Sequence, residues 1–222
     1  MADITIICAD AGSVARGNFG WYADISDGRR AEGTDIRKLS DLLISRLSEG
    51  DKVALGFECP LFVPLRNDPQ ELLCRRNGET NPNWIGGPGA TVLATGLVEL
   101  TWLLGHIRAK LNKQIPTFFD WNEFSRAQQG LFIWEAFVSG QAKGSSHVDD
   151  ARIAVDYFVN SLPNPVERNA INEGNVISLA GAALLRSGWI SDSEILSKPC
   201  LVLMVQETGG KRRVSAKKLR KY

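Results

Sequence analysis

The chain has 222 residues, of which 44% are hydrophobic and 23% are charged, and its formal net charge is +1. This length suits one large domain with a packed core. A charge so close to zero favours neither a protein that binds nucleic acid over its whole surface nor one that binds acidic substrates.

The N-terminus enters an apolar run without a basic segment, and we recognise no apolar stretch as long as the ~20 residues of a membrane span. The four cysteines are widely spaced and include no C-x-x-C pair. This spacing predicts reduced thiols and no zinc site. We therefore expect a cytoplasmic protein without a membrane partner.

The first half of the chain predicts a hairpin, a helix and a second buried strand. Residues 3–10 are apolar on both faces, and the aromatics of "NFGWYADIS" predict a strand that returns along them. In "TDIRKLSDLLISRLSEG" the apolar residues recur at helical spacing, from a cap at Thr34 or Asp35 to a stop at Gly50. The run "DKVALGFECPLFVPL" then predicts another buried strand.

The second half begins with a long irregular stretch over residues 66–89 that is rich in Gly, Pro, Asn and Arg. After it the pattern predicts, in chain order, an apolar and largely buried helix over about 90–111, a strand in "GLFIWEAFVSG", helices in "SHVDDARIAVDYFVNSL" and "EGNVISLAGAALLRSGW", and a last strand in "PCLVLMVQE".

This alternation predicts an α/β fold, with a central mixed β-sheet and helices on both faces. We expect one domain over residues 1–208, with an irregular insertion at about 66–89. A basic tail over residues 209–222 follows a "GG" break.

Three of the predicted strands end in an acid. Asp10, Glu58 and Glu135 each follow apolar residues, and the two glutamates are followed by apolar residues as well. Because the carboxyl ends of parallel strands open into one crevice, we expect these acids to meet there. Clustered carboxylates repel one another unless a cation neutralises them, and Mg²⁺ or Mn²⁺ bound through carboxylates and water is the usual solution. Two such ions are the standard device for phosphodiester hydrolysis.

A further acidic ligand is expected from the helix that begins near residue 147. Helical spacing places Asp150 at the border of its apolar face, whereas Asp149 points further towards solvent. An acidic first turn that complements the helix dipole explains both residues equally well. Glu173, at the start of the next helix, is a second candidate for the same role. His147 is a candidate proton shuttle.

The whole pattern resembles the ribonuclease-H-like superfamily, whose members open with a hairpin that bears an Asp on its first strand. They carry further acids on a later strand and near the start of a late helix. "ICADAGSVARGNFGWYAD" looks like that opening. "GFECPLFVP" is similar to the strand that supplies a Glu in RuvC-type resolvases, and to the "D-x-P-L-G-x-P" strand of the domain of unknown function 429 family, with Glu58 in place of Asp.

Two further segments resemble the domain of unknown function 429 family. "IWEAFVSG" is similar to its "E-x-x-P" strand, with Val138 in place of Pro. The late helix of that family reads "D-A-x-x-A", and both "DDARIA" and "NVISLAGAA" compete for this place. The first has the acid, and the second has the position and the small residues without the acid.

The resemblance implies a divalent-metal-dependent nuclease that hydrolyses phosphodiester bonds of a nucleic acid. We expect Asp10, Glu58, Glu135 and Asp150 to be catalytic, with Mg²⁺ or Mn²⁺ bound by Asp10, Glu58 and Asp150. Contacts to the phosphate backbone are assigned to basic residues of the irregular stretch and of the tail. These residues are Arg66, Arg75, Arg76, Lys211, Arg212 and Arg213.

Two other classes of protein are compatible with the sequence. "DAGSVARG" resembles the "D-x-G-(S/T)" phosphate hairpin of actin-like and sugar-kinase ATPases, in which Gly12 and Ser13 would touch phosphate and Asp10 would orient magnesium. Those folds normally need two such domains, and a second such hairpin is not seen in this sequence. The other class is a ribonuclease-H-like interaction domain that has lost catalysis. The oligomeric state does not follow from the sequence.

Overall fold

The computed structural model describes residues 4–79 and 84–205. In this part of the chain the main sheet has seven strands and a second sheet has two. The strands of the main sheet are β1 (Ile4–Asp10), β2 (Gly20–Asp24), β3 (Arg30–Gly33), β4 (Lys52–Glu58), β6 (Thr117–Phe118), β7 (Gly130–Val138) and β9 (Leu201–Val205). The small sheet pairs β5 (Phe62–Pro64) with β8 (Val176–Ser178).

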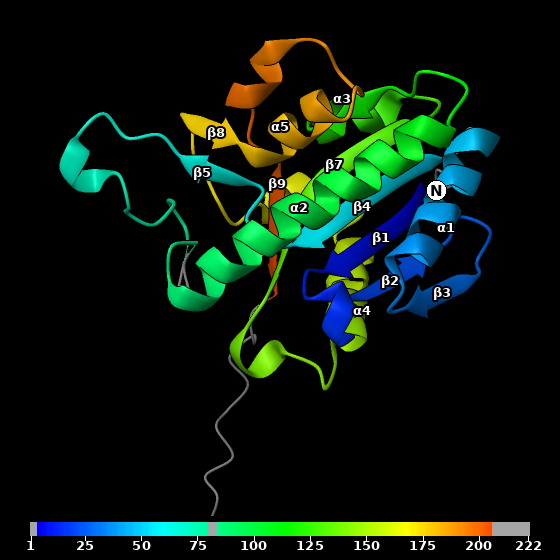
Figure 1. Cartoon of the computed structure of the whole chain (residues 1–222), viewed down its shortest axis with the longest axis horizontal. Coiled ribbons are helices and arrows are strands. Elements are labelled where there is room, and N and C mark those ends of the chain that lie inside the picture. The colour runs from blue at the N-terminus through cyan, green and yellow to red at the C-terminus, as the bar shows by residue number, and fades with distance from the viewer. Residues whose placement is uncertain (1–3, 80–83, 206–222) are drawn as a thin grey trace, which may run out of the picture.

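The main sheet is mixed, and its strand order is β3-β2-β1-β4-β7-β6, with β9 also paired to β7 (Figure 1). β2 runs antiparallel to both β1 and β3, whereas β1, β4 and β7 form parallel pairs. β6 pairs with the start of β7 and β9 with its second half, both in parallel. The predicted opening hairpin and the α/β class with a mixed sheet are confirmed.

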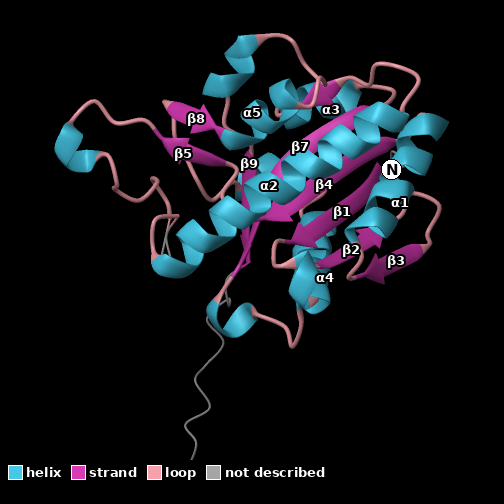
Figure 2. Cartoon of the chain, viewed as in Figure 1, coloured by secondary structure: helices cyan, strands magenta, loops and turns pink. Residues whose placement is uncertain are grey.

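Helices cover both faces of this sheet (Figure 2). α1 (Ile36–Glu49), α2 (Gly87–Lys110) and α5 (Leu179–Arg186) contribute to one apolar core, together with the odd-numbered residues of β1 and β4. α3 (Trp121–Arg126) and α4 (His147–Val159) contribute to the core on the other face, together with even-numbered residues of the same strands. Side chains alternate between the two faces of a strand, so each face of the sheet has its own core.

Local sequence signals account for the ends of several helices. Asp35 caps α1 by accepting a hydrogen bond from the backbone N–H of Arg37, and Gly50 ends this helix with a φ of 90°. Ser146 caps α4 and Ser178 caps α5 in the same way. The predicted cap and stop of α1 are therefore confirmed.

The structure departs from the sequence prediction in two of its helices. α2 was expected to be largely buried, yet Val98 is 69% exposed and Trp102 is 40% exposed. The expected helix over "EGNVISLAGAALLRSGW" is shorter, because Val176–Ser178 pair with β5 as a strand before α5 begins. The short elements β6 and α3 were not predicted, since each is too brief to show a period.

α2 also passes the length and composition test for a membrane span, which differs from our reading of the apolar runs. In the structure one side of this helix lies against the sheet face and buries four apolar side chains in the core. These are Leu100, Leu103, Leu104 and Ile107. Its apolar character is therefore accounted for in part by the packing of the domain.

Candidate metal centre

Two parallel strands place the first two acids side by side. Asp10 ends β1, Glu58 ends β4, and the register pairs these two residues directly. Because paired residues of adjacent strands point to the same face, both carboxylates emerge on the side of the sheet that α4 covers. The predicted adjacency of Asp10 and Glu58 is confirmed.

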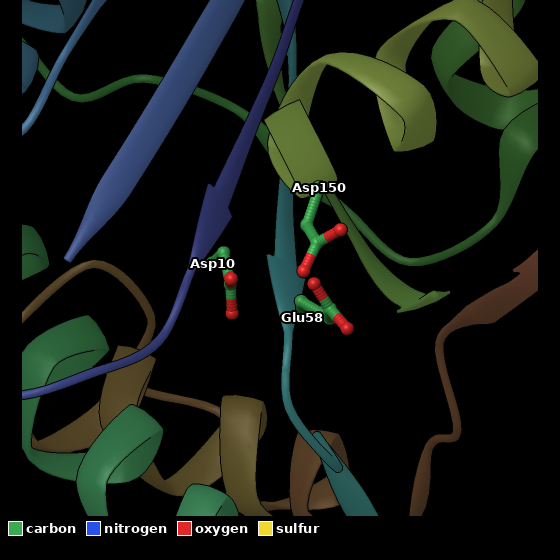
Figure 3. Close-up of side chains that lie close together, drawn as sticks. All are labelled: Asp10, Glu58 and Asp150. Carbon is green, nitrogen blue, oxygen red and sulfur yellow. The ribbon is translucent and has the colours of Figure 1, made fainter. Parts of the chain in front are cut away.

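The third acid comes from the first turn of α4. Asp150 lies close to Asp10 and Glu58, and one ligand atom from each of the three lies within 4.8 Å of the others (Figure 3). We call these three residues the carboxylate cluster. The backbone N–H of Gly144 donates to Oδ1 of Asp150 over 2.6 Å and holds this side chain in place.

A glycine in β2 lets α4 come close enough to reach the cluster. A Cβ atom at Gly20 would lie 2.4 Å from the backbone carbon of His147 and from the backbone nitrogen of Val148. No real side chain tolerates such a distance, so only glycine at this position allows the start of α4 to pack directly on β2. The same contact brings His147 and Asp150 over the end of β1.

The carboxylate cluster is buried, which makes ionisation costly. Asp10, Glu58 and Asp150 are exposed by only 4%, 8% and 5%. Burial raises the pKa of Asp10 from 3.8 to about 7, with a further upward contribution from Asp150. Burial also raises the pKa of Glu58 well above its ordinary value, and the charge of Asp10 adds to this. A cation in the cluster would favour the ionised forms.

Hydrogen bonding leaves part of Glu58 unsatisfied. Its Oε1 accepts a hydrogen bond of 3.3 Å from the backbone N–H of Val138. Its Oε2 is buried and has no hydrogen-bond partner among the described residues. A buried carboxylate oxygen without a partner is costly, so this atom is a natural ligand position for a bound cation.

One lysine partly neutralises the cluster. Nζ of Lys143 lies 3.3 Å from Oδ2 of Asp150 and 3.5 Å from Oε1 of Glu58. This charge lowers the pKa values of Asp10 and Glu58 against the effect of burial. The lysine side chain is 49% exposed, so it has room to move away. One ammonium against three carboxylates leaves two negative charges, which a single divalent ion would match.

Two further side chains, those of His147 and Glu99, act on Asp10 from opposite faces of the sheet. Nδ1 of His147 lies 2.5 Å from Oδ2 of Asp10, and the histidine side chain is 42% exposed. On the opposite face of the sheet, Glu99 of α2 accepts a hydrogen bond from the backbone of Gly12, and burial raises its pKa to about 7. The sequence analysis missed Glu99, although an acid inside an apolar helix was a visible signal.

Glu135 lies apart from the carboxylate cluster. The register pairs it with Phe57, so its side chain points to the face opposite to that of Glu58. There it forms an ion pair of 2.7 Å with Arg76 and accepts a hydrogen bond from the backbone N–H of Leu61. The structure therefore brings together three of the four acids that we expected to converge.

Arg76 is also placed differently from the expected substrate contact. Its guanidinium is 1% exposed and bridges Glu135 and Glu79 at 2.7 and 3.0 Å. These two glutamates raise its pKa further above its ordinary value, against the effect of burial. A side chain held in this way is not available to a phosphate group outside the protein.

The other candidates occupy separate places. Arg66 pairs with Glu173 over 2.7 Å, which removes Glu173 from the cluster, whereas Arg75 is exposed. Asp149 accepts hydrogen bonds from two serine hydroxyls and pairs with Arg152. Of the three alternatives for the late-helix acid, the structure thus places Asp150 in the cluster. Lys211, Arg212 and Arg213 lie outside the described residues.

Comparison of the chain with protein-family models, with curated proteins and with solved structures gave no significant match. The chemistry of the cluster therefore rests on its own geometry. Three converging, buried carboxylates suit a hard divalent cation such as Mg²⁺ or Mn²⁺.

Proposed function

We propose that this protein is a divalent-metal-dependent nuclease that hydrolyses phosphodiester bonds at the carboxylate cluster. The observation that carries the proposal is the convergence of Asp10, Glu58 and Asp150 in a buried site, where Glu58 Oε2 has no partner among the described residues. Buried carboxylates without enough positive charge around them lower the free energy of unfolding. Proteins retain such carboxylates where function requires them.

Asp10, Glu58 and Asp150 would hold Mg²⁺ or Mn²⁺. A bound ion of this kind supplies an activated water and stabilises the charge that develops on the leaving oxygen. His147 orients Asp10 through its Nδ1 and, being partly exposed, is placed to exchange a proton with solvent. Lys143, whose Nζ lies 3.3 Å from Asp150 and whose side chain is half-exposed, would be close enough to contact a phosphate oxygen of the substrate.

The arrangement also supports a ribonuclease-H-like assignment. The chain opens with the β1–β2 hairpin, and Asp10 lies on its first strand. Glu58 ends a later strand and Asp150 lies in the first turn of a late helix. These are three of the features on which the resemblance was based, whereas Glu135, a fourth, lies on the other face of the sheet.

The phosphotransferase alternative is less well supported. It assigns phosphate contacts to Gly12 and Ser13, but in the structure the backbone of Gly12 is hydrogen-bonded to the Glu99 carboxyl group. A Cβ at Gly12 would lie 1.6 Å from the carbonyl oxygen of Asn18, so the hairpin is closed tightly on itself. This packing leaves little space for a triphosphate.

The first prediction tests the proposed function directly. A screen of labelled DNA and RNA in the presence of Mn²⁺ should reveal cleavage, which Asp10→Asn and Asp150→Asn should each reduce by about 10³-fold or more. Asp149→Asn is the matched control, because its side chain sits next to Asp150 in sequence but outside the cluster. Equal cleavage by wild type and Asp10→Asn would reject the proposal. An ATP-hydrolysis assay run in parallel would detect a phosphotransferase instead.

A further inference from the structure

A small cavity adjoins the carboxylate cluster. It has a volume of about 100 Å³, and Glu58 and Lys143 form part of its wall. The rest of the wall is mainly apolar and comes from the residues that follow β4, the end of β7, the loop before α2 and the start of α2. The side chains that matter here are those of Pro60, Trp84, Pro88, Val92 and Phe137.

The size and chemistry of this cavity restrict its occupant. Pockets that enclose a whole small-molecule ligand typically have about 300–1,000 Å³, so this cavity suits a single ring or a similar fragment. The aromatic side chains of Trp84 and Phe137 are part of the wall, and aromatic rings stack favourably on planar groups. Glu58 and Lys143 provide polar contacts at the side that adjoins the cluster.

Hydrogen bonds hold both the ring and the backbone of Trp84, and the backbone contact is to a buried ion-pair network. Its Nε1–H donates to the carbonyl oxygen of Cys74, and its backbone N–H donates to Oε1 of Glu79. Glu79 is in turn paired with Arg76, which is paired with Glu135 in the second half of β7, a strand that continues beyond this acid to Val138. This chain of contacts gives Glu135 and Arg76 a positioning role, although neither belongs to the carboxylate cluster.

The first turn of α2 makes the same region favourable for an anion. Pro88 and Gly89, in the first turn of α2, line the cavity. The positive end of the helix dipole therefore points towards this side of the site. With Lys143 on the other side, an apolar cavity lies next to two positively polarised groups and a metal-binding cluster.

We propose that this cavity binds one nucleobase of the substrate, from a nucleotide next to the phosphodiester at the carboxylate cluster. This inference rests on the proposed nuclease function. The base stacks against Trp84 and Phe137, while its phosphate lies between Lys143 and the start of α2. Because stacking on aromatic side chains tolerates any base, the cavity contributes affinity more than sequence preference.

A binding experiment tests the cavity without relying on cleavage. The full chain with Mn²⁺ is titrated calorimetrically with each of the four ribonucleoside 5′-monophosphates and with ribose 5-phosphate. Stacking of one base contributes about 1–3 kcal/mol, so the nucleotides should bind about 5- to 150-fold more tightly than the sugar phosphate. Trp84→Ala and Val92→Trp should remove most of this difference, because one deletes a wall and the other fills the cavity.

Two variants serve as controls. Trp84→Phe keeps an aromatic face and should retain most of the base-dependent affinity. Val98→Trp makes the same substitution as Val92→Trp on the same helix, at an exposed position outside the cavity, and should behave as wild type. Mn²⁺ affinity and thermal unfolding of every variant are measured alongside, so a folding defect is recognised.

The outcomes separate this inference from the proposed function. Equal affinity of wild type for nucleotides and ribose 5-phosphate, or an unchanged difference in both cavity variants, overturns the cavity proposal even if the protein cleaves nucleic acid. A base-dependent difference that the cavity variants abolish upholds it, even if the cleavage screen is negative and the nuclease proposal fails.

Discussion

At the scale of single residues, the carboxylate cluster combines burial with incomplete neutralisation. Burial raises the pKa of Asp10 to about 7 and that of Glu58 well above its ordinary value. A divalent cation binds only the ionised forms, so a proton competes with the metal at each of these sites. Binding of a divalent cation at the carboxylate cluster would therefore depend on the pH of the solution.

The second prediction follows from this competition. Affinity for Mn²⁺, measured by calorimetry, should be weak at pH 6 and should increase between pH 6 and 8.5 as Asp10, whose pKa is raised to about 7, loses its proton. In buffers of different ionisation enthalpy, the measured heat should reveal proton release near pH 7. A constant affinity over this range would contradict the protonated state that burial favours.

The third prediction concerns stability without metal. The pKa of Asp10 is higher in the folded protein than in the unfolded protein. The contribution of Asp10 to the free energy of unfolding is therefore fully present below pH 3.8, where the residue is protonated in both states, and it is lost as the pH rises through about 7. The change from 3.8 to about 7 corresponds to at most about 4 kcal/mol at pH 8. Asp10→Asn should therefore raise the melting temperature of the metal-free protein at pH 8.

The same substitution should have much less effect on stability at pH 4, where Asp10 is largely protonated in the folded protein. Urea unfolding at both pH values measures the two free energies. Destabilisation by Asp10→Asn at pH 8 would mean that the ionised carboxylate is well accommodated without a cation. Stabilisation together with loss of cleavage is the result expected of a functional site.

At the scale of elements, the sequence predicted the position of an acid where that position depends on a single strand or helix. The apolar runs that end at Asp10 and Glu58 predicted two buried strands, and their parallel pairing follows from the helix between them. Helical spacing favoured Asp150 over Asp149 for the late-helix acid, while Asp149 and Glu173 stayed open as alternatives. Each of these inferences needs only the local sequence and a general rule of connection.

The position of Glu135 could not be predicted in the same way. Its strand was predicted correctly, but the face on which its side chain emerges depends on the register between β4 and β7. A shift of one residue in that register reverses the face, and the register is set by the packing of both cores. Likewise, nothing local to Arg76 shows that its partners are Glu79 and Glu135.

The fourth prediction tests the contact between α4 and β2. Gly20→Ala would place a Cβ 2.4 Å from the backbone of His147, so the start of α4 must move. We expect a loss of about 1–3 kcal/mol in unfolding free energy from this crowding, together with weaker binding of Mn²⁺. Gly174→Ala is the control, because a Cβ there has no neighbour within 4 Å. Wild-type metal affinity in Gly20→Ala would show that α4 does not position the third ligand through this contact.

At the scale of the whole molecule, charge is divided unevenly along the chain. Seven of the 26 basic residues lie in the last twelve positions, so the preceding part has 19 basic and 25 acidic residues and a net charge of −6. A body with this charge repels nucleic acid at long range. The described chain ends at Val205, which pairs with Val138. The backbone N–H of Val138 donates to Glu58, so the chain leaves the sheet at the edge that carries the carboxylate cluster.

The fifth prediction is that the basic tail supplies the affinity for the phosphate backbone, whereas the cluster supplies the chemistry. Truncation after Gly210 removes Lys211, Arg212 and Arg213 with four further basic residues. It should weaken binding of a labelled oligonucleotide at 50 mM salt. The slope of the logarithm of the binding constant against the logarithm of the salt concentration should also become less steep, by up to about 0.7–0.9 for each lost phosphate contact. The cleavage rate at saturating substrate should stay unchanged, because no ligand of the cluster is removed.

If the truncated protein bound as tightly as the full chain at low salt, an acidic body would be attracting nucleic acid without its main source of positive charge. The contacts would then have to come from groups at the site itself, such as Lys143 and the start of α2.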